Sequence, residues 1–169
     1  MSYAPTRLPN HSCRAAVPGP RLPAFEAPDQ KWAVHHTFPV HESDDGEPFA
    51  IHVSQRHDYT LVHVSGALDM ATMDETRAVL HTVLAVVGPR IVVDLGDMTF
   101  LDACGISPLV SAVHRAREHG GWVRLARVPD YQLSVLGIAK LADLLPAYES
   151  VSAAASDDGI PVSAVLQAA

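Results

Sequence analysis

The chain has 169 residues, of which 48% are hydrophobic, and a net charge of −7 with the histidines neutral. This length allows one ordinary domain with terminal extensions, and the acidic balance argues against direct DNA binding, which needs clustered lysines and arginines. The longest apolar run, residues 83–87, is far shorter than a membrane span of about 20 residues, and no apolar signal core follows the first residues. We therefore expect a cytoplasmic protein without membrane insertion.

The first 48 residues differ in composition from the rest. They hold eight of the thirteen prolines. Because proline lacks a backbone donor and fixes φ, neither a helix nor a central strand is expected to run through this segment. We predict a disordered proline-rich leader over 1–48, an ordered domain over 49–155 and a flexible tail over 156–169.

The domain is predicted to open with two strands, over 49–56 and 59–64, paired in antiparallel fashion across a short turn. Residues 65–69 break the strand pattern. A helix over 72–87 follows, where Thr72 and Glu75 have the spacing of a capping box. Gly88 and Pro89 are expected to end this helix.

An unbroken apolar strand over 91–95 is typical of a strand covered on both faces. A polar turn and a helix over 105–118 come next, with Pro108 in the first turn of that helix, and a strand over 122–126 completes a parallel crossover. A short helix over 130–136 is followed by a return to the sheet over 141–148. The order β-β-α-β-α-β-α, with room for a terminal strand and helix, predicts an α/β fold: a mixed sheet with helices packed mainly on one face.

The stretch from residue 92 to 106 holds the residues most open to a catalytic interpretation. A thiol at a helix start, such as Cys104, can be reactive, but no base is evident at a workable distance, so we favour a packed small residue. Asp94 and Asp97 suggest a carboxylate pair, yet one ends the predicted strand and the other lies in a turn. Cys13 and Cys104 lack zinc-site spacing and the histidines are scattered, so we expect no metal, no cofactor and no enzyme activity.

Three pieces of sequence carry a resemblance to a known family. They are the run Gly66-Ala67-Leu68-Asp69, the strand and junction over 91–106, and the run over 120–126 with the apolar helix after it. The second piece, a strand followed by Thr-Phe-Leu-Asp, two small residues and Gly, is the most specific. Over about residues 49–155 the chain resembles the STAS domain of bacterial anti-sigma factor antagonists.

The resemblance implies a partner and a docking face. Members of that family bind an anti-sigma factor that is also a serine kinase of the histidine-kinase-like ATPase fold, which frees the sigma factor. The implied docking face comprises the loop after the second strand and the start of the second helix: Asp69, Thr99, Asp102, Ala103, Cys104, Gly105 and Ser107. A structural alternative exists for the two aspartates, which favour such positions because their side chains cap local N–H groups.

The chain departs from the family at the phosphoacceptor position. In the family, the kinase phosphorylates the Ser or Thr directly after the motif Asp, and the added charge ejects the antagonist. Here that residue is Ala103, which cannot be phosphorylated. The docking face therefore carries over and the phosphoswitch does not. A STAS subunit of another assembly, such as a phospholipid transport complex or a stress-signalling scaffold, is the alternative function, and the sequence leaves the oligomeric state open.

Overall fold

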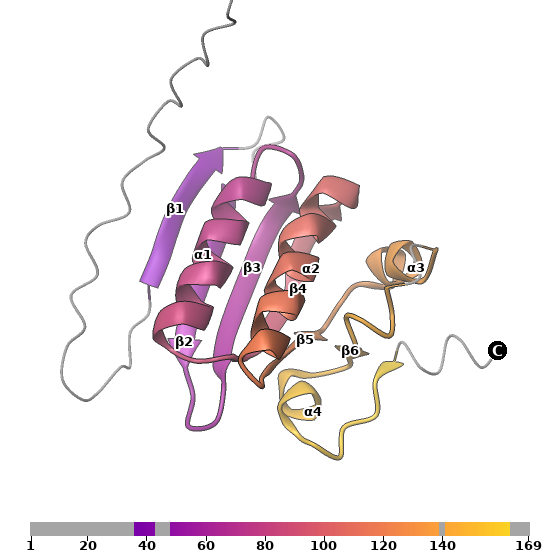
Figure 1. Ribbon diagram of the computed structural model, residues 1–169. Coiled ribbons are helices and arrows are strands. Elements are labelled where there is room, and N and C mark those ends of the chain that lie inside the picture. The colour runs from indigo at the N-terminus through magenta and orange to yellow at the C-terminus, as the bar shows by residue number, and fades with distance from the viewer. Residues whose placement is uncertain (1–35, 43–47, 139–140, 163–169) are drawn as a thin grey trace, which may run out of the picture. The chain divides into compact units, whose positions relative to one another are not determined.

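The computed structural model describes residues 36–42, 48–138 and 141–162 of the chain. The elements in this part are, in order, β1 (His36–Glu42), β2 (Pro48–Gln55), β3 (Thr60–Leu68), α1 (Met73–Val86), β4 (Arg90–Leu101), α2 (Ala103–Glu118), β5 (Trp122–Ala126), α3 (Asp130–Ile138), β6 (Ala147–Tyr148) and α4 (Val151–Ala155) (Figure 1). From β2 onward, this order confirms the predicted succession of strands and helices.

The strands form a six-stranded sheet in the order β1-β2-β3-β4-β5-β6. The β1–β2 and β2–β3 pairs are antiparallel, and the β3–β4, β4–β5 and β5–β6 pairs are parallel. The predicted mixed sheet is therefore confirmed. Because β3 and β4 are parallel neighbours, their carboxyl ends, and the loops that lead into α1 and α2, lie together at one end of the sheet.

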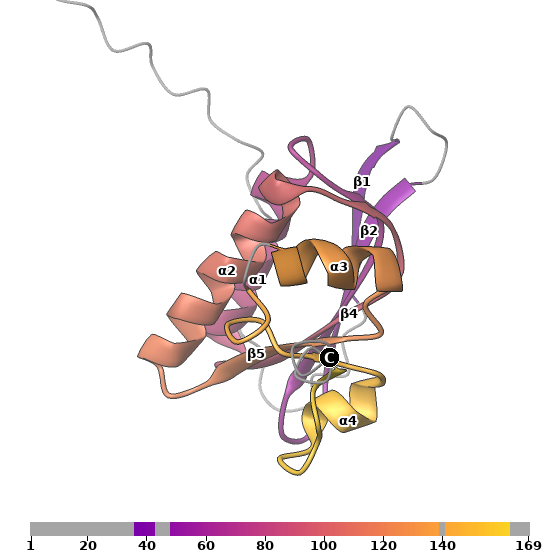
Figure 2. The same ribbon diagram turned by 90° about the vertical axis from the view of Figure 1, so that its right-hand side faces the viewer.

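Helices α1 and α2 cover one face of the sheet, and α4 packs against the other (Figure 2). Ile91 and Val93 of β4 belong to the main core beneath α1 and α2, whereas Val92 belongs to a smaller cluster with Ala154 of α4. Successive residues of β4 are thus buried on opposite faces. This double burial explains why its first half reads as an unbroken apolar run.

Strand β1 corrects the prediction for the N-terminal segment. Residues 36–42 lie within the predicted disordered leader, yet they pair with β2. Pro39 is compatible with this strand because β1 is at the edge of the sheet, where a missing N–H leaves no central ladder bond unmade. Residues 1–35 and 43–47 lie outside the described part, so the rest of the leader stays a prediction, as do the domain limits of 49 and 155.

Strands β3 and β4 are both longer than predicted. The sequence pattern placed their ends at residues 64 and 95, but β3 runs to Leu68 and β4 to Leu101, and these two residues are paired. The predicted polar turn at Gly96 and Asp97 is therefore part of a strand. Its polar residues break the hydrophobic pattern because the register shifts at this point, as a bulge does.

Two local predictions about helices are also wrong. Thr72 precedes α1, but its side chain caps no helix N–H; its hydroxyl donates to the Ala67 carbonyl and accepts from the Asp69 N–H, each at 3.0 Å. Helix α2 begins at Ala103 rather than 105, so Pro108 lies in the second turn, where its ring nitrogen has no hydrogen to donate. In place of a cap, the Thr72 hydroxyl ties the loop to the end of β3.

Arg124 of β5 holds the chain that follows α4. Its guanidinium donates to the carbonyls of Ala154 and Ser156, both at 2.9 Å, and to the Asp157 carboxylate at 3.3 Å. The same guanidinium stacks 4.1 Å from the centre of a Trp122 ring. Ser156 and Asp157, the first residues after the predicted domain limit, thus contact β5, whereas the flexibility of the tail stays a prediction; residues 163–169 lie outside the described part.

Candidate docking surface

The predicted docking residues come together where β3 and β4 end. The backbone N–H of Asp102 donates to the Leu68 carbonyl at 3.4 Å, which sets the start of α2 beside the loop after β3. Thr99, Ala103 and Ser107 are exposed, and Asp69, Asp102 and Cys104 are partly exposed. We call these six residues, together with Met70 and Phe100 introduced below, the docking surface.

Gly105, the seventh predicted residue, is buried and serves packing. A Cβ at this position would lie 2.0 Å from the Leu68 carbonyl oxygen and 2.6 Å from its carbon. No side chain fits between α2 and the end of β3. Glycine therefore lets the helix begin directly against the strand, and this close approach forms the floor of the docking surface.

Asp69 shapes the loop after β3. Its carboxylate oxygen Oδ1 accepts from the N–H groups of Ala71 and Thr72 at 2.8 and 3.3 Å. Such a turn, closed by an aspartate on the backbone two residues on, is a common use of this side chain. The structural interpretation of Asp69 is thus observed. The carboxylate is still partly exposed, so it remains available to a partner.

Asp102 caps α2. Its backbone is extended, with φ of −117° and ψ of −178°, and Oδ1 accepts from the Gly105 N–H at 2.8 Å. This bond satisfies one of the free donors of the first turn, where the helix dipole also favours a negative charge. Ala103 follows as the first residue of α2, with its methyl group exposed. Cys104 is a free cysteine and partly buried.

Two exposed apolar side chains extend the surface. Met70 is 72% exposed in the loop after β3, and Phe100 is 47% exposed near the end of β4. Exposed aromatic and methionine side chains are enriched in protein interfaces. The sequence did not single them out: Met70 lies in a loop without a hydrophobic period, and the exposure of Phe100 depends on how β4 pairs with β3.

Ser107 is tied to the neighbouring helix. Arg77 of α1 donates to the Ser107 hydroxyl at 3.2 Å and to the Asp74 carboxylate at 2.8 Å. One turn further along each helix, His81 Nε2 lies 2.9 Å from the Ser111 hydroxyl. These cross-links fix α1 and α2 relative to each other beside the docking surface.

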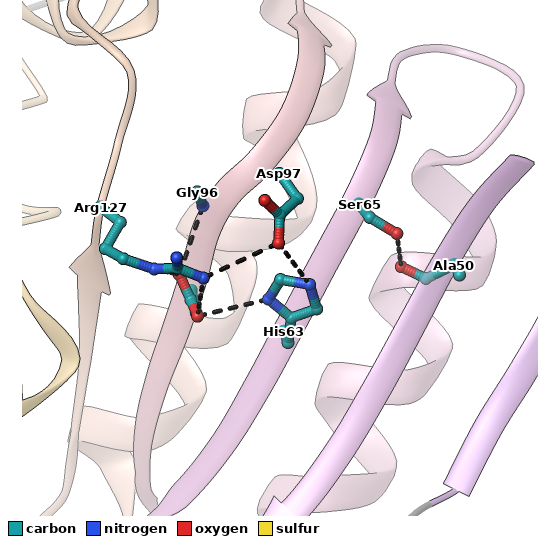
Figure 3. Close-up of polar contacts among 7 residues, drawn as sticks. Ala50, His63, Ser65, Gly96, Asp97 and Arg127 are labelled. Carbon is teal, nitrogen blue, oxygen red and sulfur yellow. Dashed lines mark hydrogen bonds and ion pairs between the residues drawn. The ribbon is translucent and has the colours of Figure 1, made fainter. Parts of the chain in front are cut away.

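A polar network lies on the sheet face opposite α1 and α2, and consists of His63, Asp94, Asp97 and Arg127 (Figure 3). The Arg127 guanidinium donates through Nε and Nη2 to the two oxygens of Asp94, each at 2.7 Å. His63 stands between the two carboxylates, with Nδ1 3.3 Å from Asp94 and Nε2 3.1 Å from Asp97. Both aspartates are therefore paired with His63 and Arg127 of the same chain.

Asp94 is the buried member, with its side chain 6% exposed. Burial favours the neutral form and is the largest single influence on the pKa of Asp94. The Arg127 fork, the Gly96 N–H and His63 together outweigh burial, so this pKa lies below its usual value. Asp94 is accordingly an ionised anchor rather than an acid that donates protons near neutral pH.

Over the described ranges, no three His, Cys, Asp or Glu side chains are grouped so that they could hold a metal ion. In the same ranges, no helix has the length and apolar character needed to cross a membrane. Cys13, the other cysteine of the sequence, lies outside them.

Comparison with known proteins gives a family model and several solved structures. The STAS domain model matches residues 50–154. A search of curated proteins found no significant match. An anti-sigma factor antagonist from Mycobacterium paratuberculosis superposes with a TM-score of 0.58 at 22% identity, covering 63% of this chain and 90% of that one.

Two further structures share the fold. A putative anti-sigma factor antagonist from Thermotoga maritima has a TM-score of 0.56 at 17% identity, over 59% of this chain and 86% of that one. The Bacillus cell-fate determinant SpoIIAA in its phosphorylated form has a TM-score of 0.50 at 14% identity, over 61% and 95%. At these identities the structures show the fold, and the family model, which spans more than half of the sequence, shows that the chain belongs to the STAS domain family.

Proposed function

We propose that this protein is an anti-sigma factor antagonist, which binds an anti-sigma factor and thereby relieves inhibition of a sigma factor. Family membership and the solved relatives named as antagonists support this function. The observation that carries it is the joint exposure of Met70, Phe100 and Ala103 beside the carboxylates of Asp69 and Asp102. Apolar side chains flanked by fixed charges at one end of a rigid sheet are suited to protein docking.

We further propose that the partner is a serine kinase of the ATPase fold and that phosphorylation does not release it. One solved relative is in a phosphorylated form. The family resemblance puts the acceptor directly after Asp102, and in this chain that residue is Ala103, whose methyl group is exposed at the start of α2. With no hydroxyl there, the partner would stay bound in the presence of ATP, acting in the cytoplasm where sigma factors direct transcription.

The docking test is affinity capture with the tagged full chain. We expect recovery of an ATPase-fold anti-sigma factor, and Thr99→Arg to weaken its binding by about 2 kcal/mol, or roughly thirtyfold. The matched control is Gln55→Arg, which places the same charge on an exposed residue at the end of β2, away from the docking surface. Equal loss in both variants, or in neither, would contradict the proposed surface. Recovery of transporter subunits would instead favour a STAS subunit of another assembly.

Two substitutions of Asp102 distinguish the contribution of its charge to binding from its contribution to helix capping. Asp102→Asn keeps a good N-cap residue while removing the charge, so a loss of binding without loss of stability assigns the carboxylate to the partner. Asp102→Arg removes both and should bind least.

The phosphorylation test uses the captured anti-sigma factor and ATP. We expect no phosphate on the wild-type chain and stoichiometric phosphate on Ala103→Ser, measured by intact mass and peptide mapping. Phosphate on the wild-type chain within residues 99–107 would contradict the proposal. A variant with Ser at 103 that stays unmodified would show that this position is not the one the kinase reads.

A further inference from the structure

Strand β4 carries two more residues than β3 over the stretch that leads to the docking surface. His63 pairs with Asp94 and Ser65 with Asp97, so β4 has one extra residue in that interval. Gly66 pairs with Met98 and Ala67 with Phe100, which leaves Thr99 as a second extra residue. Both are β-bulges in effect, and bulges re-aim the side chains that follow them.

The second bulge explains why the surface contains Phe100. In a regular strand, consecutive side chains point to opposite faces, so one of two neighbours beside a core is buried. Here Thr99 and Phe100 are both exposed, between buried Met98 and Leu101. Their joint exposure follows from the second bulge, and the first bulge, upstream, sets the register with which β4 enters it.

The polar network lies at the first bulge. Asp94 and Asp97 are the residues at its two ends, and Asp94 Oδ1 also accepts from the Gly96 N–H inside it at 3.2 Å. Arg127 reaches both carboxylates, with Nη2 2.7 Å from Asp94 and 3.8 Å from Asp97. Figure 3 shows the Arg127 side chain and His63 converging on this segment of β4 from either side.

Two structural features of Arg127 are unusual. Its φ is 54°, in the left-handed region that few residues other than glycine adopt. Its guanidinium also lies against Gly96 so closely that a Cβ there would be 2.6 Å from Cζ. Backbone strain of this kind persists where the surroundings impose it, and it is concentrated at sites with a function.

We propose that His63 and Arg127 are positioning residues for the docking surface: through Asp94 and Asp97 they hold the first bulge of β4 and thereby place Thr99 and Phe100. The effect of this placement on partner binding rests on the proposed function, whereas the placement itself is a property of the isolated chain. The carboxylates that they bind, those of Asp94 and Asp97, are not part of the docking surface.

The test compares backbone amide NMR signals of the full-length wild type and variants at pH 7. We expect the amide signals of residues 96–102 to move together in His63→Gln, because the side chain that joins the Asp94 and Asp97 carboxylates is lost. His57→Gln is the matched control and should leave these signals in place, because His57 contacts Asp58 at 2.7 Å in the turn at the opposite end of β3. Unmoved signals of residues 96–102 in His63→Gln would overturn the proposal.

Two further variants keep the test decisive if a buried change impairs folding. Asp97→Asn alters a carboxylate that is 62% exposed, and it should displace the amide signals of residues 96–102 while leaving stability nearly unchanged. Arg127→Lys keeps the charge but not the fork, so it should restore part of the Thr99 and Phe100 signal positions that Arg127→Met displaces. If Arg127→Met leaves both signals in place, the network does not position them. These measurements need no partner, so they stand or fall separately from the docking test.

Discussion

Replacing Arg127 by methionine tests how the buried carboxylate of Asp94 is stabilised. The change removes two charge-assisted bonds of 2.7 Å and leaves Asp94 with the Gly96 N–H at 3.2 Å and His63 at 3.3 Å. Breaking a buried ion pair costs about 3–5 kcal/mol. Because Arg127 is itself 44% exposed and His63 remains, we expect about 2–3 kcal/mol, or roughly 10 °C in Tm.

The assay is urea unfolding of wild type, Arg127→Met, Asp94→Asn and the double variant at pH 7. If the cost arises from a stranded charge, removing that charge as well should recover part of the loss, so the double variant is more stable than Arg127→Met. A double variant as unstable as the sum of the two single changes would refute the reasoning, because the pair would then act through independent contacts.

The pH dependence of the same variant provides a second check. The pKa of Asp94 is lowered on folding, so its ionised form stabilises the protein above the unfolded-state value of about 3.9, and this contribution is lost as pH falls through the folded pKa. Without Arg127, burial is no longer offset and Asp94 takes up a proton at higher pH. The stability difference between wild type and Arg127→Met should therefore shrink from pH 7 to pH 4, and a constant difference would contradict this account.

Three further predictions concern other parts of the domain. Gly105→Ala should destabilise the protein by about 1–3 kcal/mol in urea unfolding, since the added Cβ meets the Leu68 carbonyl at 2.0 Å and backbone must shift. Arg124→Met should speed amide hydrogen exchange across residues 151–157 without affecting α1, because it removes the bonds to Ala154, Ser156 and Asp157. His81→Gln should reduce the loss of stability between pH 7 and pH 5. Burial, and then the charges of Arg115 and Arg77, lower the pKa of His81 in the folded protein. The unfolded chain therefore binds more protons than the folded one as the solution becomes acidic, which destabilises the wild type. A variant as sensitive to acid as the wild type would show that His81 is not responsible.

Much of the fold could be predicted because periodicity and turn residues are local properties. The strand at 122–126 lies between Gly121 and a polar turn and has the predicted bounds, and the two-faced burial of β4 follows from its apolar run. What local patterns cannot show is pairing. The extra residue between Asp94 and Asp97, and the one at Thr99, are bulges only relative to β3. From sequence alone, the polar residues that interrupt this strand therefore predict a turn.

The same limit applies to the candidate site. The motif singled out Asp69, Thr99, Asp102 and Ala103, and the structure places them at one end of the sheet, in the loop after β3, near the end of β4 and at the start of α2. It could not show that Gly105 is buried, because the close approach to Leu68 comes from a strand far away in sequence. Nor could it relate Arg127 to Asp94, since the contact crosses from β4 to the chain after β5 and depends on a left-handed backbone at Arg127.

The contacts that build the docking surface make docking and phosphorylation separable in this chain. The surface is held by backbone groups and aspartates: the Asp102 carboxylate on the Gly105 N–H, the Asp69 carboxylate on its own loop, and the Leu68 carbonyl on the Asp102 N–H. The methyl group of Ala103 is exposed beside these contacts. A hydroxyl at 103 would therefore add a phosphorylation site without rebuilding the surface, and its absence removes that site without dismantling it. Under the proposed function, a chain with this surface and no acceptor would hold its partner regardless of ATP, and the polar network at the first bulge of β4 would affect docking through the placement of Thr99 and Phe100.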